Sequence, residues 1–442
     1  MSRPTHIEPW GKLRGSIHEA SELRWADQGF PKLPDKKTTL PFGMGRSYGD
    51  SCLNPDRNIC LTRSLNKFLH FDTETGVLEC EAGVTLDELL QITVPQGWFP
   101  AVVPGTKFVT IGGAIANDIH GKNHHTAGTW GNHVIEVSIL RSHRPREITN
   151  CSRTENEEMF RATIGGLGLT GIIVSAKIQL QRITSSFLHV ETQPFHSLED
   201  FYTLSKYPHN EYSVAWVDLM AKNPTGIFIA GNHNTLISDK PVHQNKQTNV
   251  PVNAPNWLVN KFSVKAFNQA YRRQHAGERG DKIQNFSSHY DPFFFPLDKV
   301  GNWNRLYGKA GFFQYQSVVP KETELEAVKV MLKAVAESKQ GSSLAVLKRF
   351  GNKPSEGMLS FPMEGTTLAM DFPNRGWDTL ELMHKLDDIV REAGGRIYAA
   401  KDTRITATDF QRQYPDWRTL ERLRDRKLMS SFWKRVTQTS SI

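Results

Sequence analysis

The distribution of hydrophobic and polar residues differs between the first part of the chain and the rest. Up to about Arg182, short apolar runs such as Val77–Glu81 have the character of strands, and glycine-rich turns separate them. The stretch Thr85-Leu-Asp-Glu88 is a capping box, in which each of the two outer side chains accepts the backbone N–H of the other, and it predicts a helix start. The first part of the chain is therefore predicted to be a mixed α+β domain that is dense in glycine.

The pattern changes after this region. Residues Glu211–Leu219 alternate as a strand does, and Ser238–Asn256 is a polar stretch typical of a long loop. Two helices are predicted because apolar residues recur three or four positions apart, at Leu325, Val328, Leu332 and Val335 and again at Leu382, Leu386, Ile389 and Ala393. A strand over Arg396–Ala400 is expected to follow the second helix and to deliver Lys401 and Asp402 into a site.

Length and composition indicate a globular protein of more than one domain. A chain of 442 residues exceeds the size of one compact core, since domains hold roughly 150 residues. The sequence contains no apolar run of about 18 residues and no apolar segment near its start, so we expect a cytoplasmic protein or one peripheral to a membrane. The four cysteines are irregularly spaced, which favours reduced thiols over disulfides or a metal site.

The net charge of +8 is compatible with a phosphorylated ligand, an anionic membrane or a nucleic acid. The sequence carries no RNA-binding consensus, zinc finger or helix-turn-helix pattern, so no nucleic-acid partner is predicted. Much of the excess charge lies near the end of the chain, at Arg418, Arg422, Arg424, Arg426, Lys427, Lys434 and Arg435. We interpret this cluster as a solvated helix face, with contact to lipid headgroups as the alternative.

Two glycine-rich stretches, Pro41–Asp50 and Pro104–Gly121, are candidates for a phosphate-binding site. Glycine lets backbone N–H groups approach a phosphate closely, and two such loops suit a pyrophosphate. Residues Gly166–Gly171 also spell GxGxxG, the dinucleotide-binding motif, which requires a helix after it. Because the strand-like run Ile172–Leu180 follows instead, this motif is interpreted as a tight turn.

A cluster of four histidines is a candidate metal site, but its spacing does not favour one. Zinc sites typically use histidines four residues apart on a helix. Gly121, Asn123 and Gly128 disfavour a helix here, so no metal is predicted for His120, His124, His125 and His133.

An ordered series of motifs gives the sequence a family resemblance. The motifs are Gly45-Arg-Ser-Tyr-Gly-Asp50, Val103-Pro-Gly-Thr106, Gly112-Gly-Ala-Ile-Ala116, Asp118-Ile-His-Gly-Lys-Asn-His-His125, Trp303-Asn-Arg305, Gln314-Tyr-Gln316, Asp371-Phe-Pro373 and Tyr398-Ala-Ala-Lys-Asp402. Together they resemble the decaprenylphosphoryl-β-D-ribose oxidase family, within the vanillyl-alcohol-oxidase superfamily of PCMH-type flavoproteins. The resemblance spans about residues 41 to 404.

The resemblance implies a two-domain α+β fold of the PCMH type. Residues 1–184 and 395–442 are expected to bind FAD, and residues 185–394 to form a substrate domain on an antiparallel sheet. The implied cofactor contacts are Pro41, Phe42, Gly43, Met44, Gly45, Arg46, Ser47, Tyr48, Gly49, Asp50, Ser51, Gly105, Thr110, Ile111, Gly112, Gly113, Asn117, Asp118, Ile119, His120, Ile172 and Tyr398. Many relatives tether FAD through a histidine of the first loop; the sequence has Tyr48 there, which predicts non-covalent FAD.

The implied reaction is the oxidation of a secondary alcohol. Such a reaction needs a hydride acceptor, which is FAD, and a group that takes the hydroxyl proton. Lys401 is the first choice for that group, either as a neutral amine or as an ammonium that polarises the alcohol oxygen. His120 is expected to share the proton transfer or to orient the sugar. Substrate contacts are implied for Lys122, Trp216, Arg305, Gln314, Gln316 and Lys348.

The family implies a substrate and a partner as well. The substrate is the ribose of a polyprenyl-phosphate lipid, whose 2'-hydroxyl is oxidised in the first half of an epimerisation for cell-envelope polysaccharide synthesis. An NAD(P)H-dependent short-chain reductase is the implied partner. The alternative is an FAD-dependent oxidase of free sugars, alditols or aldonolactones on the same fold.

The sequence departs from the family pattern at two places. Ala369 stands where the family commonly has a cysteine, so a thiol at that position is not needed for hydride transfer. The segment His289–Pro296 is longer than the equivalent segment of the family and holds three consecutive phenylalanines. We expect these side chains in the core, and contact with a prenyl chain or a bilayer is the alternative.

Overall fold

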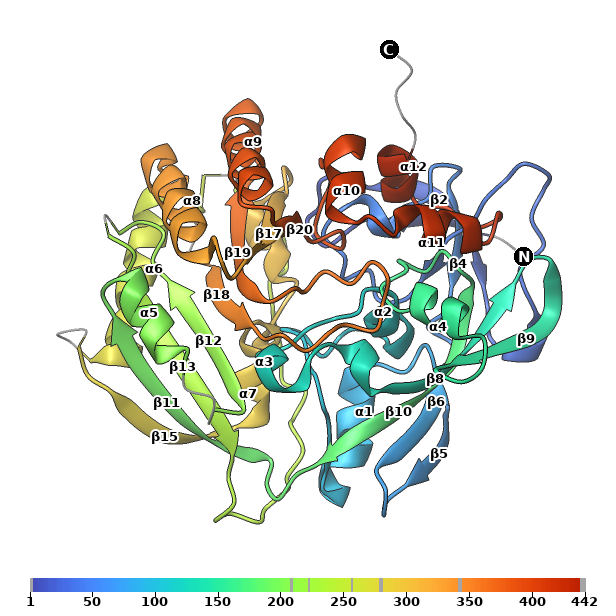
Figure 1. Ribbon diagram of the computed structural model, residues 1–442, viewed down its shortest axis with the longest axis horizontal. Helices are drawn as coiled ribbons and strands as arrows, with labels where there is room; N and C mark the ends of the chain where they lie inside the picture. Colours follow the sequence, from blue (N-terminus) through green and yellow to red (C-terminus); the bar gives the residue numbers. More distant parts are fainter. Residues whose placement is uncertain are drawn as a thin grey trace.

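The computed structural model describes residues 3–206, 210–221, 223–255, 257–277, 281–340 and 344–437 (Figure 1). The architecture is the two-domain α+β fold that was expected, with two sheets on one side and a large antiparallel sheet on the other. The N-terminal sheet has the order β1-β2-β4-β3, formed by β1 (Arg3–Ile7), β2 (Ser16–Glu22), β3 (Pro41–Phe42) and β4 (Asn58–Leu61). Strand β3 leads directly into the first glycine loop.

The second sheet is antiparallel and has the order β5-β6-β10-β8-β9, with β7 paired to β10. Its strands are β5 (Phe68–Asp72), β6 (Val77–Glu81), β7 (Trp98–Pro100), β8 (Val134–Arg141), β9 (Arg144–Ser152) and β10 (Ile172–Arg182). The associated helices are α1 (Leu86–Thr93), α2 (Ile111–Ala116), α3 (His124–Ala127) and α4 (Glu157–Thr163).

Two local predictions for this domain are confirmed. The Glu88 N–H donates to the Thr85 hydroxyl at 3.3 Å, and the Thr85 N–H donates to the Glu88 carboxylate at 2.9 Å, so the capping box starts α1. The GxGxxG stretch lies between α4 and β10 as a turn, with a strand after it.

The third sheet is the largest and has the order β15-β11-β13-β12-β18-β19-β17-β20. All of its strand pairs are antiparallel, in agreement with the expected substrate domain. Its strands are β11 (Phe187–Phe195), β12 (Tyr212–Val217), β13 (Gly226–His233), β15 (Gln284–His289), β17 (Phe312–Pro320), β18 (Ala345–Phe350), β19 (Gly365–Pro373) and β20 (Arg396–Ile397). A short parallel pair, β14 (Thr248–Asn249) and β16 (Val300–Gly301), lies outside it.

Helices cover this sheet. The helices of this part are α5 (Leu198–Leu204), α6 (Lys261–Ala276), α7 (Tyr290–Phe294), α8 (Glu324–Ser338) and α9 (Trp377–Glu392). Helices α8 and α9 are the two predicted from apolar spacing, and they pack together over β17 (Figure 1). The three phenylalanines lie in the core, as expected: Phe293, Phe294 and Phe295 are 8%, 1% and 0% exposed.

Three sequence predictions are corrected. The strand predicted over 396–400 is shorter, because β20 ends at Ile397 and Lys401 donates its N–H to the Tyr398 carbonyl in a turn. A helix does form among the histidines, since Gly128 ends α3 rather than interrupting it. The loop predicted over 238–256 contains β14, and its last residue lies outside the described residues.

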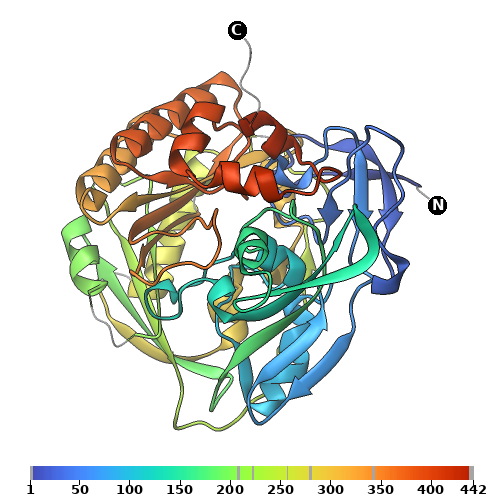
Figure 2. The ribbon, with the colours of Figure 1, turned by 45° about the vertical axis from the view of Figure 1, so that its right-hand side comes forward.

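The C-terminal helices return to the N-terminal strands. The helices are α10 (Ala407–Gln413), α11 (Trp417–Leu423) and α12 (Ser431–Thr437), and Figures 1 and 2 show them near the N-terminal strands. Helix α10 packs on α12 and β20, and α11 packs on α4. The basic cluster here is only in part a solvated face, because Arg424 pairs with Glu421 and Arg435 with Asp50. Across the described residues, no helix is both long and apolar enough to cross a membrane. The exact domain boundaries stay a prediction.

Candidate active site

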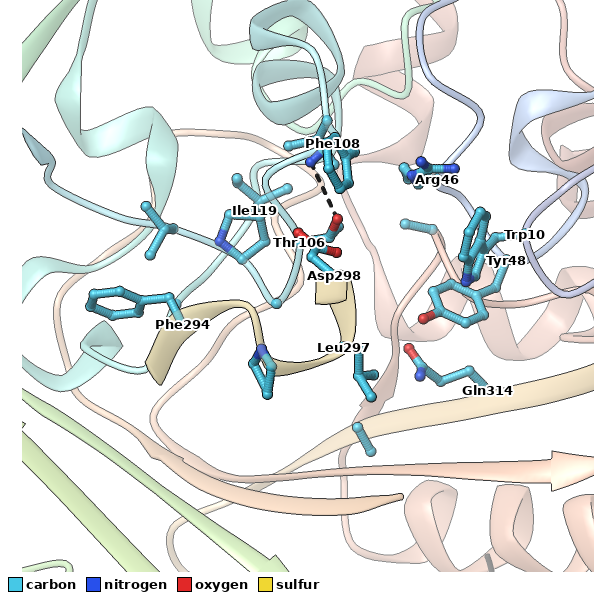
Figure 3. A pocket seen from close by; sticks show the side chains of 18 of the residues that line it. Trp10, Arg46, Tyr48, Thr106, Phe108, Ile119, Phe294, Leu297, Asp298 and Gln314 are labelled. Carbon is cyan, nitrogen blue, oxygen red and sulfur yellow. Dashed lines mark hydrogen bonds between the residues drawn. The ribbon is translucent and has the colours of Figure 1, made fainter. Parts of the chain in front are cut away.

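A cavity of about 1210 Å³ lies where the two domains meet, with walls from both glycine loops and from the large sheet. Small-molecule sites usually occupy about 300–1,000 Å³, so this cavity has room for a large cofactor together with a substrate. Figure 3 shows part of it, with Arg46, Trp10 and Tyr48 on one side and Phe294 and Ile119 on the other.

The first glycine loop offers a row of backbone donors to the cavity. Within the described part of the chain, no acceptor is found for the N–H groups of Gly43, Met44, Gly45, Arg46 and Ser47, all of which line the cavity. Successive free N–H groups of this kind bind phosphate oxygens. The loop is held in place from behind: a Cβ on Gly49 would lie 1.8 Å from the Asp402 carbonyl oxygen, so only glycine allows this contact.

The second glycine loop leaves space for a ligand. A Cβ added to Gly105 would meet no atom within 4 Å, although the residue lines the cavity. Further along, the Thr110 hydroxyl accepts the Gly113 N–H at 3.1 Å and starts α2, with Gly112 and Gly113 in the wall. The free N–H groups, the open space at Gly105 and the cavity size together fit FAD.

Filling the space at Gly105 should strongly weaken cofactor binding without unfolding the protein. We expect the Gly105→Trp variant to bind FAD at least a hundredfold more weakly, because the indole occupies the cavity, while its melting temperature as apoprotein stays near wild type. Fluorescence titration of both apoproteins with FAD measures the change. Gly105→Ala is the matched control, since a methyl group has room there. Full FAD affinity in the tryptophan variant would show that the flavin does not pass this loop.

Not every expected cofactor residue faces the cavity. Five of them do not line it: Gly49, Asp50, Ile111, Asp118 and Ile172. Two of them, Ile111 and Ile172, are completely buried in the apolar core. The Asp118 carboxylate accepts the Gly131 N–H at 2.8 Å and the Ser360 hydroxyl, and its burial raises its pKa to about 6. The neighbours Gly171 and Ile173 line the cavity where Ile172 was expected.

Three buried lysines line the cavity: Lys122, Lys348 and Lys401. Burial lowers the pKa of Lys122 to about 7 and that of Lys401 to about 8. Burial, followed by repulsion from the other two, lowers the pKa of Lys348 to about 7. Lys122 donates to the Phe293 carbonyl at 2.5 Å, but the described residues provide no hydrogen-bond acceptor for the amines of Lys348 and Lys401. The three amines therefore favour an anionic ligand.

His120 lies beside these lysines in a fixed orientation. Its Nε2 accepts a hydrogen bond from the Gln316 amide at 3.0 Å, and that amide also contacts Thr367 at 3.1 Å. Burial, then the charges of Lys348 and Lys401, hold the pKa of His120 well below its usual range, so the ring is neutral. With Nε2 as the acceptor, Nδ1 carries the proton, and it is buried without a partner among the described residues.

The remaining predicted substrate residues divide into two groups. Gln314 lines the cavity and donates to Asp371 at 2.6 Å; burial raises the pKa of this carboxyl to about 7. Trp216 lines it too and packs on Tyr271 with ring centroids 4.9 Å apart. Arg305 does not: its guanidinium donates to the carbonyls of residues 250 and 251, both at 2.8 Å, so its assignment as a substrate contact is corrected. It holds a loop in place instead.

Sequence reasoning missed several lining residues. Trp10 lies under the guanidinium of Arg46, which is 4.2 Å from its ring centroid, and both line the cavity (Figure 3). Asp298 accepts the Lys107 N–H at 2.8 Å at the same wall. No local pattern marks either residue, because their contacts join segments far apart in the chain. No cluster of metal-binding side chains is present in the described ranges.

Comparison with known proteins decides the family. A family model described as an FAD binding domain matches residues 34–143. Decaprenylphosphoryl-beta-D-ribose oxidase from Mycolicibacterium smegmatis is 36% identical over 388 residues, which cover 84% of this chain and 82% of that protein. The chain belongs to the decaprenylphosphoryl-β-D-ribose oxidase family. As a member of that family, it is an FAD-dependent oxidoreductase with a PCMH-type FAD-binding domain.

Other relatives are more distant from this oxidase-family chain. An uncharacterized protein of Streptomyces coelicolor is 27% identical over 352 residues, covering 75% of this chain and 92% of that protein. Cytokinin dehydrogenase 3 of Oryza sativa subsp. japonica is 31% identical over 175 residues, or 39% of this chain and 32% of its own length. The similarity to the oxidase and to the Streptomyces protein therefore covers most of this chain, whereas the similarity to the cytokinin dehydrogenase covers a smaller part.

Proposed function

We propose that the chain oxidises the 2'-hydroxyl of a polyprenylphosphoryl-β-D-ribose to the 2'-keto sugar. The reaction is the first half of an epimerisation to the arabinose lipid for cell-envelope polysaccharides. A separate NAD(P)H-dependent short-chain reductase completes it, and FAD is bound without a covalent link because Tyr48 occupies the place of a tethering histidine. The enzyme acts in the cytoplasm or at the membrane periphery.

The observation that carries this proposal is the amphiphilic cavity. Among its lysines, Lys348 above all favours an anion, while Trp216, Phe293 and Phe294 provide apolar and aromatic walls. A phosphate ester between a sugar and a prenyl chain matches both features in one molecule. The similarity to the mycobacterial oxidase, which covers 84% of this chain, supports the same substrate class.

The chain's own residues supply positioning and proton transfer. Bound FAD supplies the acceptor for the hydride that leaves the carbinol carbon with its electron pair. The amine of Lys401, whose pKa lies at about 8, takes the hydroxyl proton. The proton on Nδ1 of His120 donates to a sugar oxygen, because Gln316 fixes the tautomer of the ring. Gln314 and Gln316 project from the same face of β17 and hydrogen-bond further hydroxyls.

Oxidation of free sugars, alditols or aldonolactones is the second candidate. The shared FAD-binding domain favours it equally, since the match to residues 34–143 does not specify a substrate. An uncharged sugar, however, leaves the amine of Lys348 without a counter-charge.

An anaerobic absorbance titration separates the two candidates. We expect a prenylphosphoryl ribose to bleach the flavin band of the purified protein, and acid precipitation to leave free FAD in the supernatant. Bleaching by free sugars or alditols alone would replace the proposed substrate with the second candidate. Flavin that stays with the precipitate would instead overturn the non-covalent attachment at Tyr48.

A further inference from the structure

Apolar side chains are exposed in the turn before helix α6 and in the first turn of that helix. Trp257 and Phe262 are each 72% exposed, and Leu258 is 37% exposed. We call these three residues the α6 rim. The turn is ordered by hydrogen bonds, because the Asn260 amide donates to the Trp257 carbonyl at 2.9 Å and the Ser263 hydroxyl to the Leu258 carbonyl at 2.6 Å. The rim therefore presents its side chains to solvent from a fixed backbone.

Helix α6 connects this rim to the cavity. Its inner face buries Val264 and Asn268 and places Phe267 and Tyr271 in the cavity wall. On the opposite face, Phe262, Ala266 and Arg273 are spaced by four and seven residues and are all exposed. The same helix thus faces the ligand cavity on one side and solvent on the other.

The charge of α6 is uniformly positive. The helix carries Lys261, Lys265, Arg272 and Arg273 and contains no aspartate or glutamate. The Lys261 amine lies 5.0 Å from the Phe262 ring centroid, so a cation and an exposed aromatic ring are adjacent. Helices that lie in a membrane interface combine aromatic residues with lysine and arginine in this way, and anionic lipids attract the cations.

We propose that α6 and its rim dock the protein on an anionic lipid bilayer, which places the cavity that α6 lines next to the membrane. Aromatic side chains enter the headgroup boundary, and the exposed cations Lys261, Lys265 and Arg273 contact lipid phosphates. This inference rests on the proposed function, because a substrate whose prenyl chain stays in the bilayer has to reach the cavity from that side. A bilayer fits the rim better than a protein partner does, since the exposed rings are accompanied by cations and by no acids within the helix.

Vesicle binding tests the docking without any turnover. The FAD-loaded protein is sedimented with vesicles of phosphatidylcholine alone and with vesicles containing equal parts of phosphatidylglycerol. We expect binding only to the anionic vesicles, weakened by salt, and at least a tenfold loss for the double variant Trp257→Ser and Phe262→Ser. The matched control replaces two exposed tryptophans elsewhere, Trp25→Ser and Trp377→Ser, which are 53% and 68% exposed, and keeps full binding.

The outcomes separate docking from catalysis. The docking proposal is overturned if the wild-type protein does not bind anionic vesicles. It is also overturned if the rim variant binds them as well as the wild type does. A rim variant that loses only concentration-dependent self-association identifies the surface as a contact between copies, which also overturns it. Flavin bleaching by a water-soluble, short-chain substrate is expected to be equal in both double variants. If that substrate never bleaches the flavin while vesicle binding persists, the proposed function fails and the docking stands.

Discussion

The Lys401→Met variant should lose about a hundred- to ten-thousand-fold in kcat, the range that a placed base contributes. Methionine keeps the bulk of the side chain beside the Tyr48 ring, which lies 5.2 Å from the amine, but it cannot take a proton. FAD content should be unchanged, because the glycine loops do not depend on this amine. Anaerobic stopped-flow bleaching of the flavin measures the step directly.

The pH profile identifies how Lys401 acts. Burial lowers the pKa of Lys401 to about 8, and Asp371 opposes that shift through its own charge. If the neutral amine is the base, kcat/KM of the wild type rises with pH through about 8 and then levels off. The residual activity of Lys401→Met should not show this rise. A limb that falls with pH instead would assign Lys401 the role of an ammonium that polarises the alcohol.

A surface lysine provides the control for this variant. Lys333 on α8 is 75% exposed and does not line the cavity, so Lys333→Met should retain wild-type kcat and the wild-type pH profile. A Lys401→Met variant with the kcat of this control would remove Lys401 from proton transfer and leave His120 as the candidate.

Local signals in the sequence predicted the regular elements well. The capping box at Thr85 and the apolar spacing of α8 and α9 each lie within one segment, so the sequence carries the whole signal. The glycine loops were found for the same reason, because glycine marks backbone that must approach another group closely. Family resemblance then assigned Lys401, His120 and Gln316, which the structure brings together around one cavity.

Contacts between distant segments could not be predicted. One such contact is the Arg46 guanidinium over the Trp10 ring, and another is the hydrogen bond from the Lys107 N–H to Asp298. Each joins parts of the chain that no periodicity relates. Arg305 was misassigned because a motif position does not reveal where a guanidinium donates. Arg435 was interpreted as part of a solvated face, although the fold places it between two buried carboxylates.

Truncating that arginine should be severely destabilising. The Arg435 guanidinium lies 2.9 Å from Asp50 and 3.0 Å from Asp402, whose side chains are only 3% and 4% exposed. We expect Arg435→Met to lower the free energy of unfolding by about 3–5 kcal/mol, because buried carboxylates are left without a counter-charge. Urea unfolding measures the loss. The matched control is Lys434→Met, whose exposed amine lies on the same helix, and it should remain within about 0.5 kcal/mol of wild type.

The pH dependence of this loss distinguishes missing charge from missing packing. Burial already raises the pKa of Asp50, and Arg435 opposes that rise, so the variant raises it further. A carboxyl whose folded-state pKa is raised destabilises the protein as pH rises above its ordinary value, so the loss should be larger at about pH 8 than at about pH 5. Adding Asp50→Asn to Arg435→Met should restore part of the stability at the higher pH. An equal loss at both values, with no recovery in the double variant, would mean that the guanidinium acts through packing alone. In that case the first glycine loop would owe its position to the contact of Gly49 with Asp402 rather than to the arginine.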